Sequence, residues 1–414
     1  MTENLDVVII GGGQAGLSVS YFLTEQGCKH VVLEKDQIGA SWKKRWDSFH
    51  MVTPNWMLQL PGFPYQGDNP EGFLTREETV NHLESYVKQF NPRVEHLAVT
   101  AVRMDPDNLG YTVETKETTF HTKNVVVATG AYQMKKIPAE ISDQIDKTVS
   151  QIHSSEYRNP NELRPGNVLV VGTGQSGCQI AKELNEAGRK VFLSVGSCGR
   201  LPRRYRGIDG TWWATKLGIY DRTVDQLGSP REKYACNPHV SGHNQGEDIN
   251  LRQFAVDGIT LLGRLDEAHG MTVNLRPDLS DNLAKADAFA DRIMNGVDHY
   301  VTMNGMNLPD DEKRIQYEAL KTNKIPTITE LDLIEAGITT IIWATGYTPD
   351  FSWIKLPIFD DDGYPVHDRG ITAYQGLYFI GLPWLHKAKS ATLYGVGEDA
   401  EYISEDILGH LKDV

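Results

Sequence analysis

Two glycine-rich turns are the residues of this sequence best suited to bind a ligand. Both have the spacing GxGxxG, and both stand between an apolar run and a helix-like segment: VVIIGGGQAG at residues 7–16 and VLVVGTGQSG at residues 168–177. In such turns the first glycine allows the tight turn, the second lets a pyrophosphate approach the backbone, and the third permits helix–strand packing. The pattern predicts two dinucleotide sites, each with pyrophosphate at a helix N-terminus.

The two turns belong to an internal repeat with a shift of 168 − 7 = 161 residues, which indicates a duplicated unit. In each copy a second apolar strand follows the helix, ending at Glu34 and at Ser194, and a later strand ends in the tripeptide ATG, at Gly130 and at Gly346. We expect an α/β fold of two Rossmann-like dinucleotide-binding domains, the second inserted into the first.

The expected domain limits follow from these strands. Residues 1–164 and 336–414 form the first domain, closed by a strand at 376–381 and a helical tail at 397–411, and residues 165–335 form the second. Residues 221–330 are too weakly periodic to predict their topology.

Glu34 is the acidic residue expected at the first site. It lies 34 − 13 = 21 residues past the middle glycine and ends the second strand, where a carboxylate accepts hydrogen bonds from ribose hydroxyls. A simple glycine turn without a ligand is the alternative, although strand, helix and acid are all in register.

The second site has Ser194 in place of that acid, which removes a carboxylate that would repel a ribose 2′-phosphate. Arg200, Arg203, Arg204 and Arg206 follow closely, and guanidinium groups pair bidentately with phosphate. This pattern favours NADPH over NADH, against the alternative of a solvated basic loop. Two adjacent dinucleotide sites imply hydride transfer from a nicotinamide to a flavin.

Composition excludes several other classes. The 41 Lys and Arg against 55 Asp and Glu give a formal charge of −14, which disfavours nucleic acid and anionic membranes as partners. No apolar run is long enough for a membrane span, and no secretory signal is visible. The four cysteines form no CxxC pair and suit a reducing cytoplasm better than a disulfide scaffold, so we expect a cytoplasmic protein. A homodimer is considered because dimers are the commonest soluble assembly.

The chain also resembles the class B flavin-dependent monooxygenases over nearly its whole length. The resemblance rests on the two turns, the ATG tripeptides, GASWKKRWDSFHMVTPNWMLQLPGFPY at 39–65 and PRRYRGIDGTWW at 202–213. It implies that NADPH reduces FAD and that O₂ adds to form a C4a-peroxyflavin. One oxygen atom would then enter a small organic substrate by N- or S-oxygenation, Baeyer–Villiger oxidation or oxidation of an α-keto acid.

The repeat and the resemblance together give a set of expected site residues. Asn55 is the candidate catalytic residue, steadying the peroxyflavin or the nicotinamide amide, although it aligns with the family asparagine only across a one-residue gap; a loop asparagine bonded to local backbone is the alternative. No metal is expected. The expected cofactor-binding residues are Gly11, Gly13, Gln14, Ala15, Gly16, Glu34, Lys35, Trp42, Arg45, Val99, Thr129, Gly130, Gly172, Gly174, Gln175, Ser176, Gly177, Ser194, Arg200, Arg203, Arg204, Ala344, Thr345, Gly346 and Gly381.

Some residues depart from the family pattern. Its fingerprint F-x-G-x-x-x-H-x-x-x-Y reads KTVSQIHSSEY here, with Lys147 and Val149 replacing Phe and Gly, and His153 is expected to serve as a hinge or domain contact. Two alternatives to the monooxygenase therefore stay open: an NADPH oxidase that releases peroxide, and a non-catalytic flavoprotein redox sensor. A disulfide reductase is disfavoured because the chain has no CxxC or CxxxxC.

Overall fold

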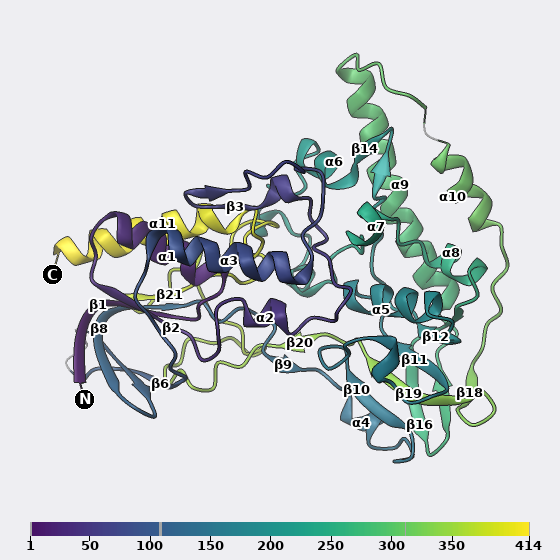
Figure 1. The fold of residues 1–414 in the computed structure, drawn as a ribbon, viewed down its shortest axis with the longest axis horizontal. Coiled ribbons are helices and arrows are strands. Elements are labelled where there is room, and N and C mark those ends of the chain that lie inside the picture. Colours follow the sequence, from purple (N-terminus) through teal and green to yellow (C-terminus); the bar gives the residue numbers. More distant parts are fainter. Residues whose placement is uncertain (1, 107–109, 311, 414) are drawn as a thin grey trace.

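The computed structural model describes residues 2–106, 110–310 and 312–413. Within them the chain forms two α/β domains, one built around each glycine turn, with the termini at the outer end of the first domain (Figure 1). The expected fold of two Rossmann-like domains is confirmed.

The first domain is built on a seven-stranded sheet. Its strand order is β5-β2-β1-β8-β7-β6, and β21 also pairs with β8. The pairs β1–β2 and β1–β8 are parallel, and Val7–Ile10 in the centre are buried because the sheet is covered on both faces. The strands are β1 (Thr2–Ile10), β2 (His30–Leu33), β5 (Val94–Glu95), β6 (Val99–Met104), β7 (Tyr111–Thr115), β8 (Thr119–Val127) and β21 (Leu377–Phe379).

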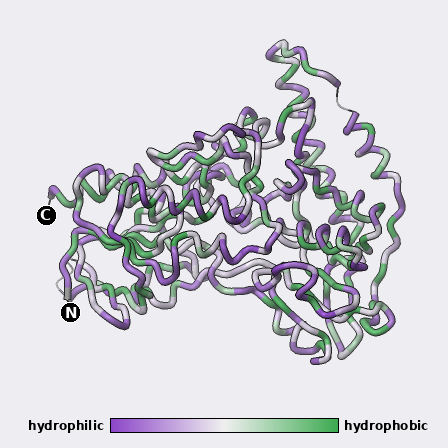
Figure 2. Tube along the Cα trace, in the orientation of Figure 1, coloured by the Kyte–Doolittle hydropathy of each residue, from purple (hydrophilic) through white to green (hydrophobic). Residues whose placement is uncertain are grey.

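Three helices, α1 (Gln14–Glu25), α3 (Arg76–Phe90) and α11 (Val396–Asp413), lie together on one side of this sheet (Figure 1). Helix α3 begins at a capping box, in which the Thr75 hydroxyl accepts from the Glu78 N–H and the Glu78 carboxylate accepts from the Thr75 N–H. Hydrophobic residues gather along the strands beneath the helices (Figure 2). The expected closing strand and helical tail are confirmed as β21 and α11.

The second domain has a five-stranded sheet in the order β10-β19-β11-β12-β15, with every pairing parallel. Its strands are β10 (Ser150–His153), β11 (Asn167–Val171), β12 (Val191–Ser194), β15 (Thr260–Leu262) and β19 (Ile338–Trp343). Helix α5 (Gln175–Glu186) follows the second glycine turn, as α1 follows the first.

This topology corrects the expected domain limits. Strands β10 and β19 both lie in the second sheet, although residues 150–153 and 338–343 were assigned to the first domain. The repeat explains the error, because each ATG strand pairs with the first strand of its own copy: β8 with β1, and β19 with β11. The limits of 165 and 335 would remove the edge strand β10 and the buried strand β19 from the second sheet.

A short antiparallel ribbon joins the two domains. It consists of β9 (Met134–Lys135) and β20 (Tyr347–Thr348), where the chain leaves the first domain and returns to it. The second domain therefore spans residues 136–346.

The segment whose topology the sequence could not predict adds an antiparallel sheet and a long helix to the second domain. The sheet consists of β16 (Leu265–His269), β17 (Thr272–Leu275) and β18 (Glu330–Asp332). Helix α9 (Leu279–Met303) is followed by α10 (Lys313–Lys321). The remaining elements are α2 (Ala40–Lys43), η1 (Asn55–Met57), β3 (Gln59–Leu60), β4 (Phe63–Pro64), α4 (Ala139–Ser142), η2 (Pro160–Glu162), β13 (Arg204–Tyr205), β14 (Ile208–Asp209), α6 (Gly210–Lys216), η3 (Val224–Gln226), η4 (Pro230–Tyr234), α7 (His243–Gly246) and α8 (Leu251–Val256).

The corrected limits predict which fragment folds. We expect residues 136–346, expressed alone, to unfold cooperatively on heating, because all five strands of the sheet are present. Residues 165–335 lack β10 and β19, which exposes the apolar edge of β11, and should aggregate or show no cooperative transition. Circular dichroism during a thermal scan distinguishes the two. Equal cooperativity of the fragments would contradict the revised boundary.

Candidate functional site

The first and third glycines of the first turn cannot be replaced by another residue without a clash. A Cβ on Gly16 would lie 2.0 Å from the Gly11 carbonyl oxygen, and one on Gly11 would lie 2.5 Å from the Ala128 carbonyl oxygen. Gly13 differs, since its Cβ position has nothing within 4 Å. The turn therefore packs tightly against the sheet and leaves an open cradle above its middle glycine, which fits a pyrophosphate.

Glu34 is held beside this cradle. Its carboxylate accepts from the Gly12 N–H at 2.7 Å and from the Asp36 N–H at 2.9 Å, so its position is fixed at the end of β2. The Glu34 N–H donates to the Glu95 carbonyl at 3.0 Å, and Val99 follows Glu95 by four residues. These contacts place Glu34, the residue expected to bind the ribose, and the start of β6 at the same end of the sheet.

Other expected residues of the first site surround the same turn. Gln14 donates to the Ala391 carbonyl at 3.3 Å, and a Cβ on Gly381 would lie 2.7 Å from the Ala15 Cβ. The C-terminal part of the first domain therefore packs on the start of α1. The Thr129 hydroxyl accepts from Gln133 at 3.0 Å beside Gly130. Lys35 is exposed.

Arg45 brings a cation to the aromatic residues of the 42–49 segment. Its guanidinium carbon lies 6.0 Å from the ring centroid of Trp42 and 5.9 Å from that of Phe49. Its Nε is buried and has no hydrogen-bond partner in the described part of the chain. An unpartnered buried donor costs about 1–3 kcal/mol, which an acceptor on a bound ligand would recover.

The second turn repeats the geometry of the first. A Cβ on Gly177 would lie 1.9 Å from the Gly172 carbonyl oxygen, and one on Gly172 would lie 2.6 Å from the Ala344 carbonyl oxygen. Ser176 lies in the first turn of α5. The middle glycine differs, because the Sγ of Cys236 lies 3.5 Å from the Cβ position of Gly174.

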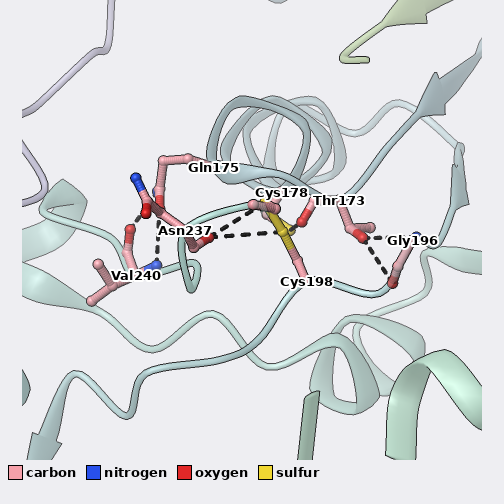
Figure 3. The surroundings of a disulfide bond; sticks show 8 residues. Thr173, Gln175, Cys178, Gly196, Cys198, Asn237 and Val240 are labelled. Atoms are coloured by element: carbon pink, nitrogen blue, oxygen red, sulfur yellow. Dashed lines mark hydrogen bonds between the residues drawn. A yellow bond between two sulfur atoms is a disulfide. The ribbon is translucent and has the colours of Figure 1, made fainter. Parts of the chain in front are cut away.

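That sulfur belongs to a disulfide between Cys198 and Cys236, whose Cα atoms are 5.6 Å apart (Figure 3). The prediction of reduced cysteines is wrong for this pair, because the fold brings together two residues 38 positions apart in the sequence. Gln175 is held beside the disulfide: its amide nitrogen donates to the Val240 carbonyl, and its amide oxygen accepts from the Val240 N–H at 3.0 Å. The Gln175 amide is thus already bonded to protein backbone.

The arginines of the expected cluster are largely engaged within the protein. Arg200 is buried, with its guanidinium 4.3 Å from the Tyr317 ring centroid and 3.6 Å from Asp287. Arg204 donates to the carbonyls of Gly246 and Gln245. The alternative of a solvated basic loop is wrong for Arg200, since the sequence reveals charge but not burial. Its role in binding phosphate stays a prediction.

Arg203 connects the two domains. Its guanidinium forms a bidentate ion pair with Asp209, donates to the Val52 carbonyl at 2.8 Å and lies 4.8 Å from the Phe73 ring centroid. Val52 and Phe73 belong to the first domain, so this fully buried cation clamps their segment against the second domain. It is a positioning residue in place of the expected phosphate ligand.

Asn55 lies three residues beyond Val52 and is 3% exposed. Its amide nitrogen donates to the Asn69 carbonyl at 2.9 Å, whereas its buried amide oxygen has no hydrogen-bond partner among the described residues. The alternative to a catalytic role was a loop asparagine whose side chain is bonded to local backbone. The amide nitrogen of Asn55 is bonded in that way, and its amide oxygen is not. The free oxygen is an acceptor at the junction of the two domains.

His153 contacts the ribbon, as expected of a hinge or domain contact. Its Nε2 is 2.9 Å from the Gly346 carbonyl, which can only accept, so Nε2 carries the proton. The ring packs edge-on against Tyr347 of β20 at 4.9 Å between centroids. The Thr345 hydroxyl donates to the Lys136 carbonyl on the opposite strand.

A second clamp joins the domains through Glu183 of α5. Its carboxylate accepts from the Ser48 hydroxyl of the first domain at 2.8 Å and from the Tyr157 hydroxyl at 2.9 Å. Burial raises the pKa of this carboxyl above its usual value, although both hydroxyl donors oppose the shift. The family-matching Tyr157 thus has a structural role.

The Ser194 hydroxyl is used within the second domain, donating to the Gly263 carbonyl at 3.0 Å. Beyond it lies an open cleft of about 410 Å³, lined by Ser197, Gly199, Ala288 and Phe289 with two exposed cations, Lys285 and Arg292 of α9. Among the described residues neither cation has an ion pair. Sequence reasoning missed both because they follow Ser194 by about ninety residues, in the segment that it could not place.

Aromatic residues pack both inside the second domain and between the two domains. Trp213 is fully buried within the second domain and contacts Trp212. Trp56, Tyr394 and Tyr220 form an edge-to-face series, with centroids 5.8 and 6.0 Å apart, that joins the first domain to the second.

No group of residues suited to hold a metal ion occurs in the part of the chain that the structure describes. No helix in the described ranges is long and apolar enough to cross a membrane.

Comparisons with known proteins agree with this architecture. Residues 8–201 match the family model of pyridine nucleotide-disulphide oxidoreductases. An uncharacterized CzcO-like oxidoreductase of Geobacillus kaustophilus is 33% identical over 99% of this chain and 100% of its own. The probable indole-3-pyruvate monooxygenase YUCCA10 of Arabidopsis thaliana is 35% identical over 48% of this chain and 52% of its own. A flavin monooxygenase from Stenotrophomonas maltophilia has the same fold, with a TM-score of 0.68 and 19% identity over 99% of both chains.

The two domains and their paired turns give the chain the fold of a flavin monooxygenase. By sequence, the chain belongs to the CzcO-like oxidoreductase family.

The open cradle of the first turn gives a test of the flavin site. We expect Gly13→Ala to leave the melting temperature of the apoprotein unchanged, because its Cβ meets nothing within 4 Å, and to weaken FAD binding at least about tenfold by filling the space for the pyrophosphate. Gly16→Ala is the matched control and should destabilise the apoprotein itself, since its Cβ would lie 2.0 Å from backbone. Flavin fluorescence titration and calorimetry measure the two effects. Unaltered FAD affinity in Gly13→Ala would exclude the first turn as the flavin site.

Proposed function

We propose that the protein is an NADPH-dependent FAD monooxygenase that inserts one atom of O₂ into a small organic substrate. The observation that carries the proposal is the buried, unpartnered amide oxygen of Asn55 at the junction of two domains, each with a complete glycine turn. The family relationship supports it, because relatives of this chain include a flavin-containing monooxygenase and indole-3-pyruvate monooxygenases.

The residues of the first site would hold FAD. The turn would take the pyrophosphate at the N-terminus of α1, Glu34 would accept from ribose hydroxyls, and Arg45 would offer its buried Nε to an acceptor on the cofactor. When bound, FAD supplies the chemistry, accepting a hydride from the nicotinamide and reacting with O₂. The protein positions the reactants and keeps water out.

Asn55 would accept a hydrogen bond at the reacting centre. Its amide nitrogen is already bound to the Asn69 carbonyl, which fixes the side chain and leaves the oxygen available for an N–H of the flavin or the nicotinamide amide. The Arg203 clamp and the Trp56–Tyr394–Tyr220 series hold the surrounding segment between the domains and exclude water. Asn55 is therefore our candidate catalytic residue.

The proposed substrates are small molecules with a soft nitrogen or sulfur, a ketone, or an α-keto acid such as an indole pyruvate. Support for the last class comes from the names of the plant relatives. A second function, NADPH oxidation with release of peroxide, is favoured by the altered fingerprint residues Lys147 and Val149, and the same experiment separates the two.

The test measures how far NADPH oxidation is coupled to oxygen insertion. With purified flavoprotein and a panel of amines, sulfides, ketones and α-keto acids, we expect at least one compound for which oxygenated product accounts for most of the NADPH and O₂ consumed. Asn55→Ala should lower this coupling about tenfold, the effect of losing one hydrogen bond of about 1.4 kcal/mol. Product is measured by mass spectrometry and peroxide by a peroxidase assay.

Asn304→Ala, an exposed asparagine at the end of α9, is the matched control and should retain full coupling. Stoichiometric peroxide with every compound would establish the oxidase function instead. Full coupling in Asn55→Ala would remove that residue from the reaction.

The cleft at α9 supports the choice of NADPH over NADH. Lys285 and Arg292 line a space beside Ser197, three residues past the end of β12, which is where a Rossmann unit presents the ribose 2′ position. Removing either cation should weaken binding of 2′,5′-ADP about tenfold or more and leave binding of 5′-AMP unchanged, because only the former carries the phosphate. Isothermal titration in reducing buffer measures both affinities.

Arg276→Ala is the matched control, since Arg276 pairs with Asp266 on the separate antiparallel sheet and should affect neither ligand. Ser197→Glu should act in the opposite sense to the cations, repelling the phosphate. Equal loss of both ligands in the Lys285 and Arg292 variants would show that the cleft does not read the 2′-phosphate.

A further inference from the structure

The middle glycines of the two turns differ in what lies above them. Nothing is within 4 Å of the Cβ position of Gly13, whereas the Sγ of Cys236 lies 3.5 Å from that of Gly174. A middle glycine lacks a side chain so that a pyrophosphate can approach the backbone. At the second turn the sulfur of Cys236 takes up that space.

The segment that carries Cys236 is fastened across the turn. The disulfide ties it to Cys198, four residues past the end of β12, and the Val240 backbone is bonded to the Gln175 side chain at the start of α5 (Figure 3). Between them, the His239 N–H donates to the Gly199 carbonyl at 3.0 Å. These contacts hold Cys236 over Gly174.

The oxidised chain therefore does not fit a dinucleotide at its second turn, although Gly172, Gly177 and Ala344 have the geometry that such a ligand requires. The obstacle is one covalent bond to one residue. We infer that the Cys198–Cys236 disulfide is a thiol-reactive site that governs access of the nicotinamide dinucleotide: the oxidised form excludes the pyrophosphate and the reduced form admits it. The inference rests on the nicotinamide site of the proposed function.

The two sulfurs differ in accessibility, which sets the direction of the reaction. Cys236 is exposed, as are most of residues 231–237, whereas Cys198 is 5% exposed. A thiolate of a small dithiol attacks the Cys236 sulfur, the S–S bond breaks, and the Cys198 thiolate leaves and takes a proton. The second thiol of the reagent then displaces Cys236, so that the disulfide gains two electrons and two protons and the dithiol becomes a cyclic disulfide.

Reduction removes the covalent bond between Cys236 and Cys198 and leaves only weak sulfur contacts with the Asn237 carbonyl, at 3.4 Å from Cys236 and 3.8 Å from Cys198. The Gln175–Val240 contacts remain, but no bond then holds the sulfur against Gly174. The second turn can thus acquire the open cradle seen at Gly13. A thiol reductant, acting through this site, would switch on the step in which the nicotinamide reduces the flavin.

The test measures NADP⁺ binding to the full-length, FAD-loaded protein in both redox states. Protein is oxidised with diamide or reduced with dithiothreitol, desalted without oxygen, and titrated with NADP⁺ by calorimetry, while mass spectrometry of alkylated peptides reports the state of Cys198 and Cys236. We expect at least tenfold tighter binding by the reduced protein. Cys236→Ser should bind with the affinity of the reduced protein in both conditions, because serine cannot form the bond.

Cys28→Ser is the matched control, since Cys28 is a free cysteine of the first domain, and it should respond to redox state as the unaltered protein does. Equal NADP⁺ affinities while the peptides show that the disulfide has opened would overturn the inference, as would failure of diamide to join Cys198 to Cys236. Absence of NADP⁺ binding in all forms, Cys236→Ser included, would overturn both this inference and the nicotinamide site. A redox effect in the absence of any oxygenated product would refute the monooxygenase proposal alone.

Discussion

At each dinucleotide turn the third glycine lies directly against the carbonyl oxygen of the first, so close that any side chain would displace the helix. This contact fixes the first turn of α1 over β1 and that of α5 over β11, and it aims both helix N-termini at the space above the turn. The neighbouring ATG strands complete the arrangement, because the carbonyls of Ala128 and Ala344 press on the first glycine of each turn. The Asn55 segment, the Arg203 clamp and the Glu183 clamp have a role at this site only because the two domains bring two such turns to one junction.

Much of this could be predicted from the sequence, because glycine spacing, apolar runs and the acid at the end of β2 are local signals. The strands and helices around both turns follow from them. The domain limits failed because strand pairing is not local: the repeat itself implied that residues 338–343 pair with the second copy. The disulfide was missed for the same reason, since Cys198 and Cys236 become neighbours only in the folded chain.

The arginines show a different limit of sequence reasoning. Four guanidinium groups within seven residues indicate a phosphate site only if they reach solvent, and the sequence does not show that Arg203 meets Asp209 and Val52. A buried, bidentate ion pair that loses one partner typically costs about 3–5 kcal/mol, so Asp209 fixes the Arg203 side chain within the second domain. The fixed guanidinium then reaches the first domain through its hydrogen bond to the Val52 carbonyl. The cations with free access to a cleft are on α9, where the weak periodicity of the sequence gave no reason to look.

In the β9–β20 ribbon the two crossings of the chain between the domains lie side by side as paired antiparallel strands. Two separated crossings would attach the second domain to the first at two places, whereas one narrow ribbon attaches it at a single place. A change in the relative orientation of the domains would break the hydrogen bonds of Arg203 with Val52 and of Ser48 with Glu183. The ribbon therefore joins the domains at one place, and these two contacts hold the second domain in its orientation against the first.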